Sequence, residues 1–215
     1  MIINMALMDR IFSVTVSLCV FLRIFCGCSS ASVSPSGSEV FIEAESFKDK
    51  GGWVLDQQFM DIMGSPYLMA HGMGVPVQDA VTTAVIPETG MYHVYVRTFN
   101  WTAPWTSKPG PGRFQVKVGD RRLSAVLGSE GSEWMWQYAG KVRLKAGETT
   151  VTLHDLTGFN GRCDVIYMTT EEGAVPPADA DGLAAFRRKM LSLPEPQTEG
   201  CLLYTSDAAD DLIGV

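Results

Sequence analysis

Three acidic side chains are spaced so that they can act together. Glu43 and Glu45 are two residues apart in a strand-like run, and Asp164 lies in a second apolar run late in the chain. Carboxylates at i and i+2 of a strand point to one face. If the first and last strands are neighbours, the three acids form an oxygen-ligand cation site where the sheet closes. The alternative is that Glu43 and Glu45 are solvated or pair with Arg143 or Arg162.

Strands must position these groups, because most of the chain alternates apolar and polar residues between Gly/Pro turns. Only the segment 182–193 has the period of a helix, which Asp179 or Asp181 would cap. The segment 59–76 is expected to be a long loop with short extended pieces. The sequence therefore predicts an all-β antiparallel β-sandwich with a short C-terminal linker helix. Strands are predicted at 40–45, 79–86, 91–99, 113–118, 141–144, 149–154 and 163–169.

The N-terminal residues 1–32 have the pattern of a bacterial export signal. A basic residue precedes the apolar run 11–22, which is too short for a permanent membrane anchor. Cys28 is then the lipidated first residue of the mature chain, or else the signal is cleaved after Ala31 or Ser32. The expected location is periplasmic, in the outer membrane as a lipoprotein, or secreted.

The remaining chain divides into one domain and two C-terminal pieces. The sandwich module is expected at 39–172, followed by a linker at 173–200 that contains the helix. Residues 201–215 begin with CLLYTSDAAD, which resembles a translated transposase adapter used in preparing sequencing libraries. A genuine acidic tail is the alternative. On the adapter interpretation, the native protein continues beyond about residue 200.

Charge and cysteine content restrict the functional class. The net charge of -7 argues against nucleic acid or an anionic membrane surface as partner. Of the five cysteines, only Cys163 belongs to the expected domain, so an internal disulfide is excluded there. We expect Cys163 to be a small buried side chain, and stability to come from core packing.

Several segments resemble known protein modules. The ordered motifs EAE, GMYHVYVR, KAGETTVTL and DVIY are similar to the β-jelly-roll carbohydrate-binding modules of families 6 and 35, which have a galactose-binding-like fold. The segments GGWVLDQQFMD, MGSPYLMAHGMG, GRFQVKV and HDLTGFNGRCD resemble the front module of secreted Bacteroidetes FAD-dependent oxidoreductases. This resemblance covers about residues 40 to 190.

The resemblance implies two cofactors. In the jelly-roll modules the acids of the first and last strands hold a structural Ca²⁺, which implies Glu43, Glu45 and Asp164 as metal ligands here. FAD would belong to a downstream domain that opens with a glycine-rich fingerprint. This chain contains no such fingerprint, so no flavin-binding or redox residue is assigned.

Aromatic loops form the second candidate site. A sugar ring offers an apolar C–H face for stacking on an indole and hydroxyls for polar side chains. Three alternatives stay open for Trp101 and Trp105: exposure to solvent, burial, or packing against a missing domain. Trp53 and at least one of Trp134 and Trp136 are expected in the core. The predicted ligand-binding set is Trp101, Trp105, Trp134, Asn160, Arg162 and His71.

Catalytic patterns are not found in the sequence. His93 and His154 lie in predicted strands and are expected to be structural, while His71 lies between loop residues suited to a ligand. The sequence contains no nucleophile elbow and no zinc-ligand spacing. A carboxylate pair for glycoside hydrolysis is not singled out.

The sequence therefore predicts a non-catalytic, carbohydrate-binding-like accessory module of an exported FAD-dependent oxidoreductase-like protein. Its expected partner is a glycan or its own downstream flavin domain. The alternative is a structural lid that packs on that domain without binding sugar. A free-standing glycan-active hydrolase is the third hypothesis.

Overall fold

The structure is a computed structural model, and it describes residues 37–106 and 108–194. The expected export signal with Cys28 and the segment 201–215 lie outside the described residues. Within the described ranges, no helix has the length and apolar character needed to cross a membrane.

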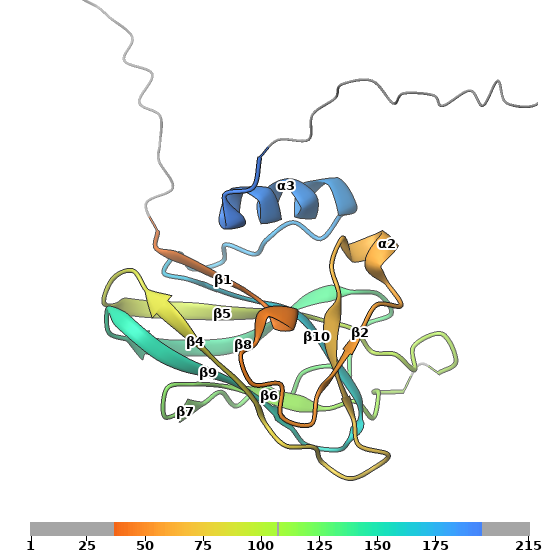
Figure 1. The fold of residues 1–215 in the computed structure, drawn as a ribbon. Helices are drawn as coiled ribbons and strands as arrows, with labels where there is room; N and C mark the ends of the chain where they lie inside the picture. Colours follow the sequence, from red (N-terminus) through yellow and green to blue (C-terminus); the bar gives the residue numbers. More distant parts are fainter. Residues whose placement is uncertain (1–36, 107, 195–215) are drawn as a thin grey trace, which may run out of the picture. The chain divides into compact units, whose positions relative to one another are not determined.

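The described residues form two stacked antiparallel sheets, so the predicted all-β sandwich is confirmed (Figure 1). The larger sheet has the order β2-β3-β10-β5-β8, with β1 also paired to β10. Its strands are β1 (Glu39–Glu43), β2 (Val54–Asp56), β3 (Tyr67–His71), β5 (Gly90–Thr98), β8 (Met135–Leu144) and β10 (Phe159–Thr169). The smaller sheet, in the order β4-β9-β6-β7, contains β4 (Ala80–Ile86), β6 (Phe114–Val118), β7 (Arg121–Arg122) and β9 (Gly147–Asp155).

Strand β10 changes its partner halfway along one edge. Its first half, from Phe159 to Cys163, pairs with β3, and its second half, from Val165 to Thr169, pairs with β1. On the other edge it pairs with β5, where the register shifts between Cys163 and Val165. Asp164 therefore lies where β1 and β3 meet. The prediction that the first and last strands are neighbours is confirmed.

The main core fills the space between the sheets. Alternation in β6 turns Phe114, Val116 and Val118 inward, and all three are buried. The ring of Trp53 meets that of Phe114 edge-on, with centroids 5.5 Å apart, which confirms Trp53 as a core residue. Cys163 is buried with a free thiol, as expected.

The segment predicted as a long loop with short extended pieces, 59–76, contains strand β3 as an extended piece and also the short helix α2 (Met60–Met63), which was not predicted. Strand β3 buries Tyr67, Leu68 and Ala70 while pairing with β10, so tertiary contacts stabilise a segment that lacks a clear period. Glu45 also differs from expectation, because β1 ends at Glu43 and the following residues form a 3-10 turn, η2 (Ala44–Ser46).

Helix α3 (Ala180–Leu191) covers the outer face of the larger sheet, away from the smaller sheet (Figure 1). Asp179 caps it by accepting a hydrogen bond from the backbone N–H of Gly182 at 2.8 Å. A second apolar cluster lies beneath the helix. It contains Leu183, Phe186 and Met190 from α3 with Phe41, Tyr95, Trp136, Val165 and Tyr167 from the sheet.

We predict that Phe114→Ala lowers the free energy of unfolding by about 3–5 kcal/mol, because it opens a cavity in the main core. The matched control is Val85→Ala on the exposed side of β4, which should change stability by less than about 0.5 kcal/mol. Urea denaturation monitored by tryptophan fluorescence would measure both. Equal effects of the two substitutions would contradict the described packing.

Candidate functional site

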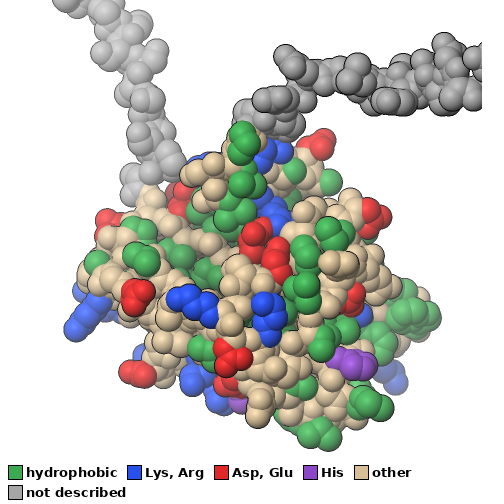
Figure 2. All heavy atoms as spheres, in the orientation of Figure 1, with side chains coloured by type: hydrophobic (Ala, Val, Ile, Leu, Met, Phe, Trp, Pro, Cys, Tyr) green, Lys and Arg blue, Asp and Glu red, His purple; other side chains and the backbone are tan. Residues whose placement is uncertain are grey.

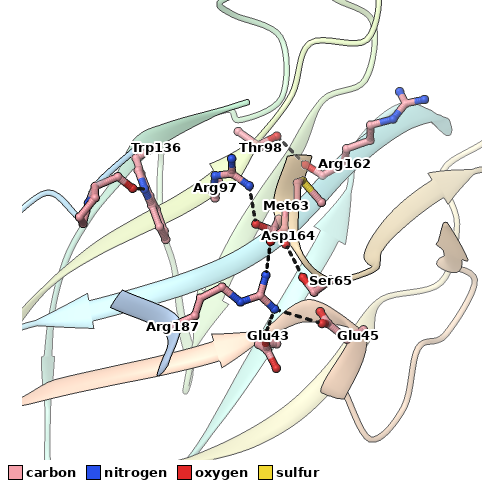
Figure 3. A network of polar contacts seen from close by, with 11 residues as sticks. Glu43, Glu45, Met63, Ser65, Arg97, Thr98, Trp136, Arg162, Asp164 and Arg187 are labelled. Atoms are coloured by element: carbon pink, nitrogen blue, oxygen red, sulfur yellow. Dashed lines mark hydrogen bonds and ion pairs between the residues drawn. The ribbon is translucent and has the colours of Figure 1, made fainter. Parts of the chain in front are cut away.

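Five charged side chains converge where β10 changes its partner, and we call them the seam cluster (Figure 3). The carboxyl groups of Glu43, Glu45 and Asp164 are brought together as the sequence predicts. The two arginines of the cluster, Arg97 on β5 and Arg187 on α3, were not predicted. Neither Arg143 nor Arg162 is the ion-pair partner of Glu43, because Arg187 takes that position.

Asp164 is the most deeply buried member of the seam cluster. Its Oδ2 accepts a hydrogen bond from Nη1 of Arg97 at 2.8 Å, and its Oδ1 accepts one from the hydroxyl of Ser65 at 3.2 Å. The side chains of Arg97 and Asp164 are 2% and 0% exposed. Burial raises the pKa of Asp164, and the nearby charges of Arg97 and Arg187 act against that rise.

Arg187 reaches from α3 to the two glutamates. Its Nη2 forms an ion pair with Oε1 of Glu43 and lies 3.7 Å from Oε1 of Glu45. Its Nη1 donates a hydrogen bond to the carbonyl oxygen of Met63 in α2, at 2.6 Å. Figure 3 shows the same side chain pointing toward Asp164. One guanidinium group thus connects α3 with β1, η2 and α2.

The charges of the cluster explain the behaviour of Glu45. Three carboxyl groups face two guanidinium groups, so one acid is in excess when all five are ionised. Burial raises the pKa of Glu45 to about 7, and the negative charges of Glu43 and Asp164 add to the rise. Glu45 therefore holds its proton at pH values where a solvated glutamate has lost it.

The seam cluster does not fit the calcium ion that the resemblance implies. Carboxylates and a backbone carbonyl are ligand types that calcium takes, but it needs six to eight oxygens. Here both side-chain oxygens of Asp164, Oε1 of Glu43 and the carbonyl oxygen of Met63 already accept hydrogen bonds or form ion pairs with other protein groups. Among the described residues, no group of three or more His, Cys, Asp or Glu side chains is arranged to hold a metal.

A second group, the aromatic surface, lies at the start of β10 and the end of β3. It consists of His71, Trp101, Trp105, Phe159, Asn160 and Arg162. Trp101 donates a hydrogen bond from Nε1 to the carbonyl oxygen of Phe159 at 2.8 Å, and its ring lies 6.2 Å from that of Trp105. The side chain of Trp105 is 76% exposed. Five of the six predicted ligand-binding residues therefore belong to one surface.

Polar groups of the aromatic surface are held in place by their neighbours. Nδ1 of His71 and Oδ1 of Asn160 are 2.7 Å apart, and Asn160 has a positive φ of 57°. The guanidinium of Arg162 lies over the ring of Trp101, at 5.9 Å from its centroid, and over the rings of Tyr67 and Phe99. This stacking holds the buried guanidinium of Arg162 against the half-buried ring of Trp101.

Trp134, the sixth predicted residue, is not part of the aromatic surface. It is only 8% exposed and packs against Phe59, Tyr67 and Phe99, with Arg97 over its ring at 5.7 Å. Its position in an apolar strand-edge segment did not distinguish core from surface. Phe159 was missed, although the sequence places it between Gly158 and Asn160 in a turn-forming segment.

The other candidate histidines lie in strands, as expected. His93 contacts the hydroxyl of Tyr138 through Nδ1 at 3.0 Å, and His154 contacts Asp79 through Nδ1 at 2.7 Å. Both lie outside the aromatic surface.

Two pockets flank the loop that carries the tryptophans. One, of about 520 Å³, includes Phe159 and Thr157 in its wall, and the other, of about 510 Å³, includes Asn100 and Glu130. Pro109 lines both. The exposed aromatic rings therefore stand beside hollows large enough for small polar molecules.

No protein-family model matches the chain, and no curated protein matches it. Among solved structures, a GH26-CBM35 β-(1,4)-mannanase from Podospora anserina aligns at 20% identity and a TM-score of 0.49, over 65% of this chain and 29% of that one. A family 35 carbohydrate-binding module from Clostridium thermocellum aligns at 16% identity and 0.48, over 61% of this chain and 97% of that one. The C-terminal family 6 module of a laminarinase from Zobellia galactanivorans aligns at 16% identity and 0.45, over 61% and 98%.

These similarities are distant, and the chain spans less than a third of the mannanase.

The raised pKa of Glu45 predicts a pH-dependent effect of Glu45→Gln. Between the ordinary value of 4.5 and about 7, folded Glu45 holds a proton that the unfolded chain has lost. Its stabilising contribution is complete below pH 4.5 and is lost as the pH rises through about 7. Glutamine resembles the protonated acid at every pH. The melting temperature of Glu45→Gln should therefore equal that of the parent chain near pH 4.5 and exceed it in slightly alkaline buffer.

The expected gain in alkaline buffer is about 2–4 °C in melting temperature, measured by circular dichroism. Titrating groups away from the seam cluster are common to both chains and cancel in the difference. A difference that stays constant with pH would contradict the assignment.

Proposed function

We propose that the module binds carbohydrate through the aromatic surface and is itself non-catalytic. The observation that carries this proposal is the 76% exposure of Trp105 beside Trp101. An indole left in water forgoes the stabilisation that its burial would give, so an exposed indole beside a second ring and oriented polar groups is typical of a ligand site.

The chemistry of the neighbouring groups favours a sugar over a purely apolar ligand. Asn160 and His71 offer hydrogen-bonding atoms at the edge of the surface, while the buried guanidinium of Arg162 lies over the ring of Trp101 and supports it. Stacking of a pyranose C–H face on an indole leaves its hydroxyls directed sideways, where amide and imidazole groups can meet them. Among the described residues of this surface, the hydrogen bonds orient side chains, and none of them pairs a nucleophile with a general base.

We predict that Trp105→Ala weakens binding to a retained polysaccharide by roughly 3- to 10-fold, because it removes one stacking ring worth about 0.5–1.5 kcal/mol. Affinity electrophoresis on a panel of soluble polysaccharides would measure the retardation. Tyr138→Ala is the matched control, since Tyr138 is exposed but contacts His93 and Tyr95 on another part of the sheet.

An unretarded parent chain across the panel would contradict carbohydrate binding. Equal losses in the two variants would contradict the aromatic surface as its location.

A second candidate, the structural lid, is favoured by a different surface. Val54 and Leu55 on the edge strand β2, with Met60 and Ile62 on α2, are between 41% and 50% exposed. Figure 2 shows hydrophobic side chains gathered over β2 and α2. Clustered apolar side chains on a surface are typical of a protein–protein contact. In this proposal they dock on a flavin domain of an exported FAD-dependent oxidoreductase, which rests on the sequence resemblance alone.

The lid hypothesis is testable once the genomic reading frame after residue 200 is known. If that frame encodes a flavin domain, Ile62→Asp should weaken its association with the module at least tenfold, a loss of about 1.4 kcal/mol, because a charge enters an apolar contact. Isothermal titration calorimetry of the two purified domains measures this. Trp105→Ala serves as the control and should leave the association unchanged. A frame without a flavin domain would remove this candidate.

A further inference from the structure

The guanidinium of Arg187 occupies the position among the seam-cluster oxygens that a bound metal cation would take. The guanidinium lies against Glu43, Glu45 and the carbonyl oxygen of Met63, which are the kinds of oxygen that a hard divalent cation would take. It arrives from α3, more than a hundred residues along the chain from the glutamates. Figure 3 shows the side chain extended toward the carboxylates from the helix above them.

Arg187 and a divalent metal compete for the same lone pairs. A calcium ion bound to Glu43 and the Met63 carbonyl would lie in the space of the guanidinium and repel its charge. The oxygens of Asp164 give no alternative, because Arg97 and Ser65 already donate hydrogen bonds to them. The guanidinium of Arg187 and a calcium ion therefore cannot occupy this position at the same time.

The remainder of α3 holds Arg187 in position independently of the seam cluster. Leu183, one turn earlier on the helix, is buried against the sheet, so the face that carries Arg187 is the packed face. The ring of Phe186 meets the rings of Phe41 and Tyr167 edge-on, at 5.7 and 5.3 Å. Lys189 adds an ion pair with Glu39 at 2.9 Å. Contacts other than those of the Arg187 guanidinium therefore fix the orientation of the helix.

Arg97 neutralises Asp164, and Arg187 neutralises Glu43. The cluster is therefore balanced without a metal when Glu45, whose pKa is raised, carries a proton. A buried carboxylate pair without any cation would be strongly destabilising.

We propose that Arg187 of α3 is a built-in replacement for a bound divalent cation, so that the helix holds β1, α2 and β10 together where a metal would otherwise do so. Two consequences follow. The parent chain is indifferent to calcium and to chelators, and removing the guanidinium uncovers an oxygen site that calcium fills.

The test uses the full chain with Arg187→Met, which keeps the apolar stem and removes the charge. Arg121→Met on the exposed strand β7 of the other sheet is the matched control. Melting temperatures are recorded by circular dichroism in chelator and in millimolar calcium chloride, and calcium binding is followed by isothermal titration calorimetry. Arg187→Lys is added, because it keeps a charge on a shorter side chain if Arg187→Met does not fold.

For the parent chain and for Arg121→Met, we expect no heat of calcium binding in the calorimeter and no change of melting temperature on adding calcium. Arg187→Met should melt roughly 10 °C lower in chelator, recover part of that loss in calcium, and bind calcium in the calorimeter. Arg187→Lys should lose less and respond less to calcium. A parent chain that melts lower in chelator would overturn the proposal. So would an Arg187→Met chain that matches Arg121→Met, or one that is destabilised without any calcium response.

Discussion

The ion pair between Asp164 and Arg97 is the interaction on which the rest of the structure depends. Both side chains are almost entirely removed from water, and an unpaired charge at that depth would destabilise the fold by several kcal/mol. Asp164 is satisfied only when β5 supplies Arg97 and the residues before β3 supply Ser65. The partner change of β10 at this position brings these groups together, so sheet topology and charge pairing require one another.

The aromatic surface and the seam cluster are connected through β10. Arg162 and Asp164 are two residues apart on this strand, and one stacks on Trp101 while the other pairs with Arg97. Between them lies the apolar cluster of Met63, Tyr67, Phe99 and Trp134. Met63 packs in that cluster and also accepts the hydrogen bond of Arg187. The exposed rings therefore rest on a rigid base in which aromatic packing and ion pairing share members.

Much of this arrangement follows from the sequence, and the rest depends on contacts between distant residues. The period-two runs identify most strands, and the acids of the first and last strands indicate that these two are neighbours. The helix is readable because Leu183, Phe186 and Met190 share a face. Arg187 was not readable as the partner of Glu43, because a charged residue on a helix is usually solvated and nothing local marks its target. Trp105 follows a proline in a loop and Trp134 lies at a strand edge, but neither setting fixes burial, and it is the packing of Phe59 and Tyr67 around Trp134 that buries it.

The pairing of β1 with β10 also affects how this chain acquires its structure during synthesis. Glu39 is aligned with Thr169, so the first strand has no ladder partner until nearly the entire domain has left the ribosome. Contacts between residues so far apart in sequence form slowly, because the entropy cost of closing the loop comes before the stabilisation from strand pairing. Until then the nascent polypeptide presents apolar strand edges, which makes it a natural client for holding chaperones.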